Sequence, residues 1–140
     1  MFEYNYTVHL CVEHPSCAVA LITDLLNITP KRSIGFGDVI QGGTPFKRTA
    51  VKTYWTCQLH DEQRLFSGTI KINDFLERQS SNLEKHREFF TRIMDEGGAS
   101  YLRVEWFSIS KTSSDQLDAR TLWLLGKIRL GLQLDFSGPG

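Results

Sequence analysis

Hydrophobic and polar residues alternate one by one in four stretches of the chain, and this pattern predicts four strands. The stretches are residues 2–13, 53–59, 100–110 and 132–136. Because successive side chains of a strand point to opposite faces, each stretch is expected to bury one face of a sheet. The first strand is expected to have a second, wet face, formed by Glu3, Asn5, Thr7, His9, Cys11 and Glu13.

Apolar residues spaced three and four apart predict helices between these strands. One helix is expected from Pro15 to about Leu26, and a long helical region is expected over residues 73–96. Weak helix formers around Asn82 are expected to interrupt the long region, so that two helices could meet there. A third helix is expected after residues 113–115, whose Ser-Ser-Asp sequence is typical of an N-terminal cap.

The predicted order is β-α-β-α-β-α-β, within a single domain over residues 1–140. Strands of a doubly covered parallel sheet read as continuous apolar runs, whereas these strands alternate. We therefore expect an α+β fold: a two-layer sandwich with helices on one face of a mixed or antiparallel sheet of four to five strands. Residues 31–52 show no period and many glycines, so they predict a long connection in which a short edge strand over residues 38–41 could be hidden.

The charge balance narrows the classes of function. The chain has 16 basic and 16 acidic residues, and its formal net charge is zero. Broad non-specific binding to nucleic acid or to an anionic membrane needs a basic excess, so we expect neither. The sequence has no apolar run long enough to span a membrane, and its three cysteines are expected to be reduced thiols. These features favour a cytoplasmic protein.

The strand over residues 100–110 separates an expected core face from a candidate recognition face. Leu102, Val104 and Trp106 share one face and are expected in the core, as is Trp55 of the second strand. The opposite face is a candidate binding surface because aromatic residues and arginine are enriched at protein interfaces. The alternative is that the long connection covers its aromatic residues. This face carries Tyr101, Arg103, Glu105 and Phe107.

A second group of candidate binding residues lies in and beside the long connection. Basic and aromatic side chains follow one another there, as in proteins that bind single-stranded nucleic acid. The neutral total charge and the expected burial of Trp55 argue against nucleic acid, so a protein partner is preferred. The candidate residues are Asp38, Lys47, Arg48, Lys52 and Tyr54.

Two Cys-x-x-His pairs raise the question of a metal site. Cys11 and His14 form one pair, and Cys57 and His60 form the other. Four such ligands would suit tetrahedral zinc. However, Cys11 belongs to the polar face of its strand and Cys57 to the apolar face of its own, so their thiolates are expected to diverge. We therefore expect no cofactor, and zinc remains an alternative.

No arrangement of residues in the sequence predicts catalysis. The chain has no Gly-x-Ser-x-Gly motif, and residues 35–38 lack the lysine and the third glycine of a phosphate-binding loop. Cys17 near a helix N-terminus could have a lowered pKa, but an ordinary packing thiol is the simpler interpretation. An enzyme or a ligand-binding domain would need a pocket under residues 31–52, lined by Asp38, Trp55, Trp106 and Ser108.

Short motifs occur in an order that resembles a known family. Residues 26–30 read Leu-Asn-Ile-Thr-Pro, Gly37-Asp38 follows, and residues 54–56 read Tyr-Trp-Thr. Further along, residues 106–108 read Trp-Phe-Ser and residues 130–136 read Leu-Gly-Leu-Gln-Leu-Asp-Phe. In this order the motifs resemble the family of small bacterial proteins known as domain of unknown function 4279. The resemblance supports the predicted fold, and it implies no reaction because none is established for the family.

These observations lead to two hypotheses of function. The first is a non-catalytic protein-interaction domain, specifically an immunity-type protein that binds and neutralises a cognate bacterial toxin. It is favoured by the small size and neutral charge of the chain and by its lack of an acid–base or metal constellation. The second is a small ligand-binding or hydrolytic domain with its pocket under residues 31–52. The identity of the partner and the oligomeric state are open at this point.

Overall fold

A six-stranded sheet forms the centre of the computed structural model, which describes residues 3–40 and 48–138. The strand order is β2-β5-β1-β7-β8, and β6 pairs with one end of β1. All pairs are antiparallel except β7–β8, which is parallel, so the sheet is mixed. The strands are β1 (Tyr4–His14), β2 (Arg32–Ile34), β5 (Thr53–Gln58), β6 (Leu65–Phe66), β7 (Ala99–Ser108) and β8 (Gly131–Ser137).

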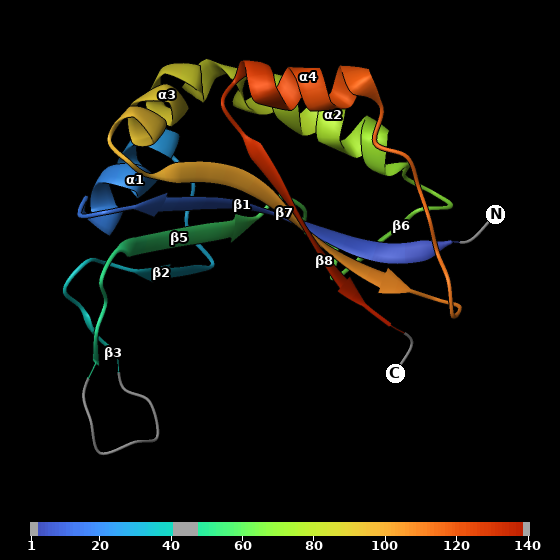
Figure 1. Ribbon diagram of the computed structural model, residues 1–140, viewed down its shortest axis with the longest axis horizontal. Helices are drawn as coiled ribbons and strands as arrows, with labels where there is room; N and C mark the ends of the chain where they lie inside the picture. The colour runs from blue at the N-terminus through green and yellow to red at the C-terminus, as the bar shows by residue number, and fades with distance from the viewer. Residues whose placement is uncertain (1–2, 41–47, 139–140) are drawn as a thin grey trace.

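Within the described residues, four α-helices lie on one side of this sheet and none on the other side (Figure 1). The chain therefore has an α+β fold. Helix α1 contacts β5, α3 contacts β7, and α4 packs against α2. The helices are α1 (Val19–Leu26), α2 (Ile72–Leu83), α3 (Arg87–Asp95) and α4 (Ala119–Lys127), with a 3-10 helix, Glu84–His86, between α2 and α3.

The sheet has more strands than the four to five expected, and the order along the chain is not a simple alternation. The expected connection contains β2 at the sheet edge and a separate hairpin of β3 (Val39–Ile40) and β4 (Arg48–Thr49). Strand β6 forms in the turn before α2. Each of these strands has only two or three residues, too few for a two-residue period to be recognised.

The third predicted helix begins later than expected. Asp118, and not the earlier Ser-Ser-Asp segment, caps the first turn of α4. Polar groups of that segment accept hydrogen bonds from aromatic core residues instead. The Trp106 Nε1–H donates to Ser113 Oγ at 2.7 Å, and the Tyr4 hydroxyl donates to Asp115 at 2.5 Å. Tertiary hydrogen bonds thus replace the local cap that the sequence suggests.

The long helical region divides close to the expected position. Helix α2 ends at Leu83, and the 3-10 turn leads into α3. The region ends at Gly97, whose φ of 89° favours glycine, and the Gly98 N–H donates to the Ile93 carbonyl at 2.8 Å.

The sheet face under the helices forms the hydrophobic core. Trp55, Leu102, Val104 and Trp106 are all buried there. The two tryptophans lie far apart along the sheet, and the Trp106 ring stacks on that of Tyr4 with 3.6 Å between centroids. The central strand β1 contributes the side chains of Tyr4, Tyr6, Val8, Leu10 and Val12, each at most 1% exposed.

The middle of the second face of β1 is not wet, contrary to the expectation from its polar residues, whereas Asn5 and Glu13 near its ends are partly exposed and Glu3 is exposed. Thr7, His9 and Cys11 are 5%, 3% and 6% exposed. Strand β1 has neighbours on both sides, and their side chains reach over it: Glu105 bonds to Thr7, and Thr56 Oγ1 lies 3.4 Å from Cys11 Sγ. Thr7, Cys11 and the Nε2 atom of His9 are therefore buried with partners rather than solvated, whereas His9 Nδ1 is buried without a hydrogen-bond partner among the described residues.

Candidate functional site

The side of the sheet opposite the helices is here named the open face. Residues in register on neighbouring strands point to the same side, so five strands contribute adjacent side chains. Strand β1 provides the buried floor, and the flanking strands provide the exposed groups. The members are Arg32 and Ile34 of β2, Tyr54, Thr56 and Gln58 of β5, Thr7, His9 and Cys11 of β1, Tyr101, Arg103, Glu105 and Phe107 of β7, and Gln133 and Asp135 of β8.

A polar cluster lies at the centre of the open face, where β1 meets β7. One carboxylate oxygen of Glu105 accepts hydrogen bonds from the Thr7 hydroxyl at 3.0 Å and from His9 Nε2 at 2.8 Å. Arg103 Nη2 lies 3.9 Å from the same oxygen, and Arg103 Nε lies 4.0 Å from Asp135. Since Thr7 and His9 are buried, they fix the position of the partly exposed Glu105 beside Arg103.

Burial sets the protonation states in this cluster. Desolvation lowers the pKa of His9 below its ordinary 6.5, and the charge of Arg103 adds to this effect against the opposing influence of Glu105. Burial alone would raise the pKa of Glu105, but hydrogen bonds from Thr7 and His9 outweigh it, and this pKa lies below its usual value. At neutral pH the cluster therefore combines a neutral imidazole, a carboxylate and a guanidinium.

A hollow of about 370 Å³ opens beside the cluster, between β7 and the β2 edge. Arg32 and Arg103 line it together with Tyr54 and Tyr101, and Cys11 also contributes to the lining. Burial raises the pKa of Tyr101 to about 12, so its hydroxyl remains protonated at neutral pH. The hollow thus offers guanidinium and phenol donors, which suit the carboxylate or carbonyl oxygens of a bound partner, and the Glu13 carboxylate, which also lines it, is paired with Lys52.

Charged side chains lie over aromatic rings at two places around the open face. Lys52 Nζ lies 4.9 Å from the centre of the Tyr54 ring and 3.1 Å from the Glu13 carboxylate. Hydrogen bonds to Tyr54 and Glu13 raise the pKa of Lys52. The Arg64 guanidinium lies 3.7 Å from the centre of the Phe107 ring. Stacking of this kind restricts exposed side chains before a partner binds, which lowers the entropic cost of binding.

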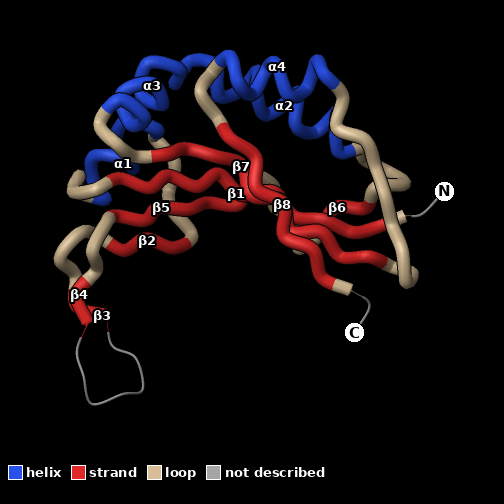
Figure 2. Tube along the Cα trace, in the orientation of Figure 1, coloured by secondary structure: helices blue, strands red, loops and turns tan. Residues whose placement is uncertain are grey.

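The β3–β4 hairpin projects from the β2–β5 side of the sheet, away from the helical layer (Figure 2). It and its flanks carry apolar side chains in water: Phe36 is 55% exposed, Val39 is 56% exposed and Val51 is 80% exposed. Three exposed apolar side chains on one hairpin and its flanks make this segment a candidate for contact with another protein. The hairpin therefore extends the candidate surface beyond the sheet.

The candidate residues of the connection have different roles. The Asp38 carboxylate accepts the Gly35 N–H at 2.7 Å and so shapes the turn before β3, which is a structural role. Arg48 is exposed in β4, apart from the polar cluster. Lys47 lies outside the described residues. The structure thus brings Lys52 and Tyr54 to the open face with the β7 residues, whereas Asp38 and Arg48 belong to the hairpin.

The four residues expected to line a pocket under the connection do not converge. Trp55 and Trp106 pair with different positions of β1. These two positions are six residues apart along the strand, which is about 20 Å at the rise of a strand. Asp38 lies in the hairpin segment, and Ser108 ends β7 with its hydroxyl 2.5 Å from that of Ser113. This particular pocket is therefore not formed, because both tryptophans are core residues.

The side chains of the two Cys-x-x-His pairs have separate environments. Cys11 lies on the open face, and Cys57 lies in the core. His14 Nε2 lies 2.7 Å from Glu96, and His60 accepts a backbone N–H of β1. In residues 3–40 and 48–138, no three His, Cys, Asp or Glu side chains gather as a metal site requires.

The thiols are not activated. Burial raises the pKa of Cys11 and Cys17, and it raises the pKa of Cys57 to about 12. The alternative of a lowered pKa at Cys17 is therefore wrong: desolvation dominates, and the Glu96 charge adds to it.

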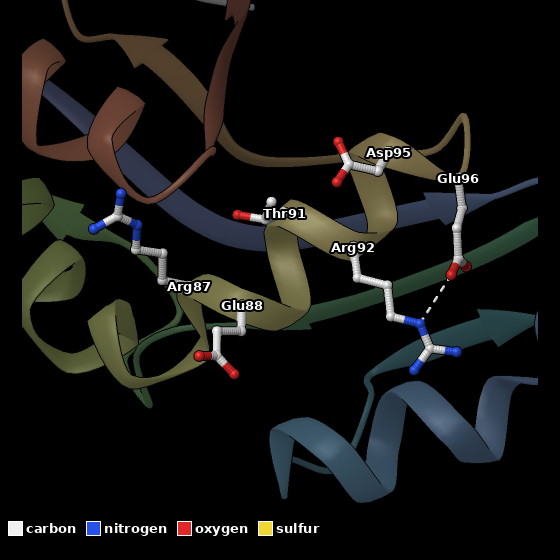
Figure 3. A pocket seen from close by; sticks show the side chains of 6 residues that line it. All are labelled: Arg87, Glu88, Thr91, Arg92, Asp95 and Glu96. Atoms are coloured by element: carbon white, nitrogen blue, oxygen red, sulfur yellow. Dashed lines mark hydrogen bonds and ion pairs between the residues drawn. The ribbon is translucent and has the colours of Figure 1, made fainter.

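A second hollow, of about 650 Å³, lies on α3 in the helical layer (Figure 3). Its lining comes from a single helix and its end, and it mixes both charge signs. Arg92 Nε donates to Glu96 at 2.9 Å, so these two opposite charges already compensate each other. These features are those of a solvated helix surface, so the smaller hollow on the open face is the better candidate site. The lining residues are Arg87, Glu88, Thr91, Arg92, Asp95 and Glu96.

Several residues of the open face were not among the sequence candidates. Arg32 belongs to a strand too short to predict, and His9 was assigned to a wet face although it is buried. Asp135 could have been found, since it alternates with apolar residues in the last predicted strand. Arg64 has no sequence signal, because its position over Phe107 depends on the pairing of β6 with β1.

The fold and the site define a class: a small α+β domain with helices on one sheet face and an aromatic, charged surface on the other. No helix among the described residues has the length and apolar composition to cross a membrane. The family model of a domain of unknown function, DUF4279, matches residues 3–138, and the chain belongs to this family. Comparisons with curated proteins and with solved structures give no match.

Proposed function

We propose that the chain is a non-catalytic protein-interaction domain that binds its partner through the open face. The observation that carries this proposal is the grouping of Tyr54, Tyr101 and Arg103 around one hollow, on a sheet face that no described helix covers. Tyrosine and arginine are over-represented among the residues that contribute most to binding energy. The hairpin projects away from the helical layer, and the exposed apolar residues that it and its flanks carry add a second contact region.

The buried polar cluster supports binding rather than chemistry. Thr7 and His9 hold Glu105 from below, and Arg103 lies beside it, so the exposed groups are ordered before any partner arrives. A prearranged surface loses less entropy on binding than a flexible one. The thiols of the described residues have raised pKa values, which does not favour a nucleophilic role.

Within this class we propose an immunity-type role, in which the chain binds and neutralises a cognate toxin in the cytoplasm. Such a role requires a specific binding surface and no reaction of its own. The open face has both charge signs, from Arg32 and Arg103 on one hand and Glu105 and Asp135 on the other. Mixed charges favour a specific protein partner over nucleic acid, which would require a basic surface.

The test is co-expression with the protein encoded by the neighbouring gene. If that protein is a toxin, the chain should restore growth, and the purified pair should bind in calorimetry. The double variant Tyr101→Ala/Arg103→Ala should weaken binding about 100-fold, as expected for two residues at the centre of an interface. It should also lose the growth rescue.

The matched control changes the opposite side of the molecule. Trp123 is 62% exposed and Leu122 is 47% exposed on α4, so Leu122→Ala/Trp123→Ala removes comparable exposed side chains from the helical layer. This variant should bind as well as the unmodified chain. The proposal fails if the neighbouring protein neither binds nor harms the cell, or if the helix variant loses binding and the open-face variant does not.

A second candidate function is the binding of a small acidic ligand in the hollow itself. Its volume of about 370 Å³ and its two arginines and two tyrosines are suitable for a small carboxylate, and the Glu13 carboxylate in the same lining is offset by Lys52 at 3.1 Å. Thermal denaturation with a panel of small carboxylates would test this function. A shift that disappears in Arg32→Ala, in a chain without a protein partner, would favour the small ligand over the immunity-type role.

A further inference from the structure

The two edges of the sheet differ in their protection against pairing with another strand. Strand β2 has three residues, follows Pro30-Lys31 and begins with Arg32. Short length, proline and exposed charge are the means by which natural sheets prevent edge-to-edge association. Strand β8 has seven residues, and its sequence Gly-Leu-Gln-Leu-Asp-Phe-Ser has no proline, lysine or arginine. Its one charged residue, Asp135, lies 4.0 Å from Arg103 of β7 and accepts a hydrogen bond from Gln133 of its own strand, so its charge is partly compensated within the chain. Only the β8 edge is therefore long and unprotected.

The outer side of β8 is also uncovered. In the described part of the chain β8 pairs only with β7, and its backbone makes no hydrogen bond to another segment. Figure 1 shows β8 in front of β7 with no other ribbon in front of it. Phe136 lies on the helix side of the strand, 5.5 Å from the Trp106 ring, but it is 68% exposed. An exposed aromatic side chain thus lies beside unpaired backbone groups.

We propose that β8 pairs antiparallel with β8 of a second copy of this chain, about a two-fold axis at Leu134, and that the two sheets become continuous. In this register all seven residues of β8 find a partner. Leu132 lies opposite the partner's Phe136 on the helix side. Gln133 lies opposite the partner's Asp135 on the open face, where an amide can donate to a carboxylate.

The neighbouring registers are worse. An axis at Asp135 places two carboxylates directly opposite each other, which is unfavourable. An axis at Gln133 leaves Phe136 and Ser137 beyond the paired strand. A shift by one residue places apolar side chains against polar ones, because the side-chain period of a strand is two. The sequence of β8 therefore favours one self-complementary arrangement.

This dimer is independent of the proposed function. Pairing at the β8 edge extends the sheet sideways, and the hollow lies towards the opposite edge, next to β2. A dimer could form whether or not the open face binds a toxin. The tests below therefore use purified chain alone, and their failure would not affect the open-face proposal.

Sedimentation velocity over a range of concentrations tests the association. The mass should rise from 16.0 kDa towards twice that value, with a dissociation constant tighter than about 1 mM. Phe136→Lys should weaken the dimer at least tenfold by placing a charge in the pairing region. Phe36→Lys is the matched control, since Phe36 is 55% exposed just after β2, at the opposite edge of the sheet, and it should leave the dimer unchanged. A monomer at all concentrations up to about 1 mM overturns the proposal.

Disulfide cross-linking tests the register, in a Cys17→Ser background so that the remaining native thiols are buried. A mixture of Gln133→Cys and Asp135→Cys chains should cross-link under mild oxidation, since these positions lie opposite each other. Each variant alone should cross-link poorly, because like positions are then diagonal and too far apart for a disulfide. Efficient cross-linking of either variant with itself, or no cross-linking of the mixture, contradicts an axis at Leu134. This measurement also decides the matter if Phe136→Lys does not fold.

Discussion

The two faces of the sheet come from alternate residues of the same strands, but they differ in the kinds of side chain that they carry. The face under the helices contains large apolar side chains that are almost completely buried, such as Trp55 and Leu102. The open face contains Tyr54 and Arg103 on its surface above a floor of buried polar groups. The first face holds the fold together by excluding water. The second holds exposed groups in place through hydrogen bonds, which suits recognition.

The largest expected effect comes from changing adjacent residues of β5 that point to opposite faces. Trp55→Ala should lower the free energy of unfolding by about 3–5 kcal/mol, because it removes a fully buried side chain and leaves a cavity. Tyr54→Ala, on the open face, should lower it by less than about 1 kcal/mol. Urea denaturation of both variants provides the measurement. Equal losses would mean that the open face is a second core.

The next effect is a dependence of stability on pH. The pKa of buried His9 is lowered, so below about pH 6.5 the unfolded chain binds a proton that the folded chain resists. The free energy of unfolding should therefore fall as the pH decreases, by at most about 1.4 kcal/mol per pH unit for one proton. The measurement is urea denaturation at several values between pH 8 and pH 5.

A pair of histidine variants separates the two sides of the molecule in this experiment. The pKa of His86, in the helical layer, is also lowered by burial, although His86 is more exposed than His9. His9→Asn should remove more of the pH dependence than His86→Asn. The opposite ranking would show that the open face does not hold a neutral imidazole.

A smaller effect is expected from the hydrogen bond under Glu105. Thr7→Val keeps the shape of a buried side chain and removes its hydroxyl, so it should cost about 1 kcal/mol. Thermal or urea denaturation would measure the loss. An increase in stability would mean that the buried polar residues destabilise the fold and that their role is in recognition.

The smallest effect should come from the surface pair at the edge of the open face. Lys52 contacts Glu13 and the Tyr54 ring, but its side chain is partly exposed and the pair is screened by water. Lys52→Ala should change the free energy of unfolding by less than about 0.5 kcal/mol. Loss of toxin binding without loss of stability would place Lys52 in the recognition surface.

The predictability of these features from the sequence depends on the length of the pattern that specifies them. Long alternating strands such as β1 and β7 identified the core positions Leu102, Val104 and Trp106, because period and burial agree there. The strands β2, β3, β4 and β6 are too short to show a period, so the position of Arg32 on the edge strand of the open face could not be predicted. Asp115 could not be assigned correctly either, because its partner is the hydroxyl of Tyr4, at the other end of the chain.

The candidate site required information about which strand lies next to which. Alternation assigns Arg103 and His9 to polar faces, but it does not reveal that both belong to one cluster. That follows from the antiparallel pairing of β1 and β7, in which His9 lies opposite Arg103. Similarly, polarity alone suggests that Thr7 is wet, whereas a strand in the middle of a sheet can bury a polar face when its neighbours supply partners.

The central position of β1 also has a consequence for folding during synthesis on the ribosome. Glu13 pairs with Ala99 and Tyr4 pairs with Ser108, so the strand is synthesised long before β7, its longest partner, leaves the ribosome. During that interval an alternating strand of tyrosine, valine and leucine has one unsatisfied edge. Pairings between distant segments form slowly and leave such edges open to aggregation. We expect nascent chains that end before β7 to depend on chaperones for their solubility.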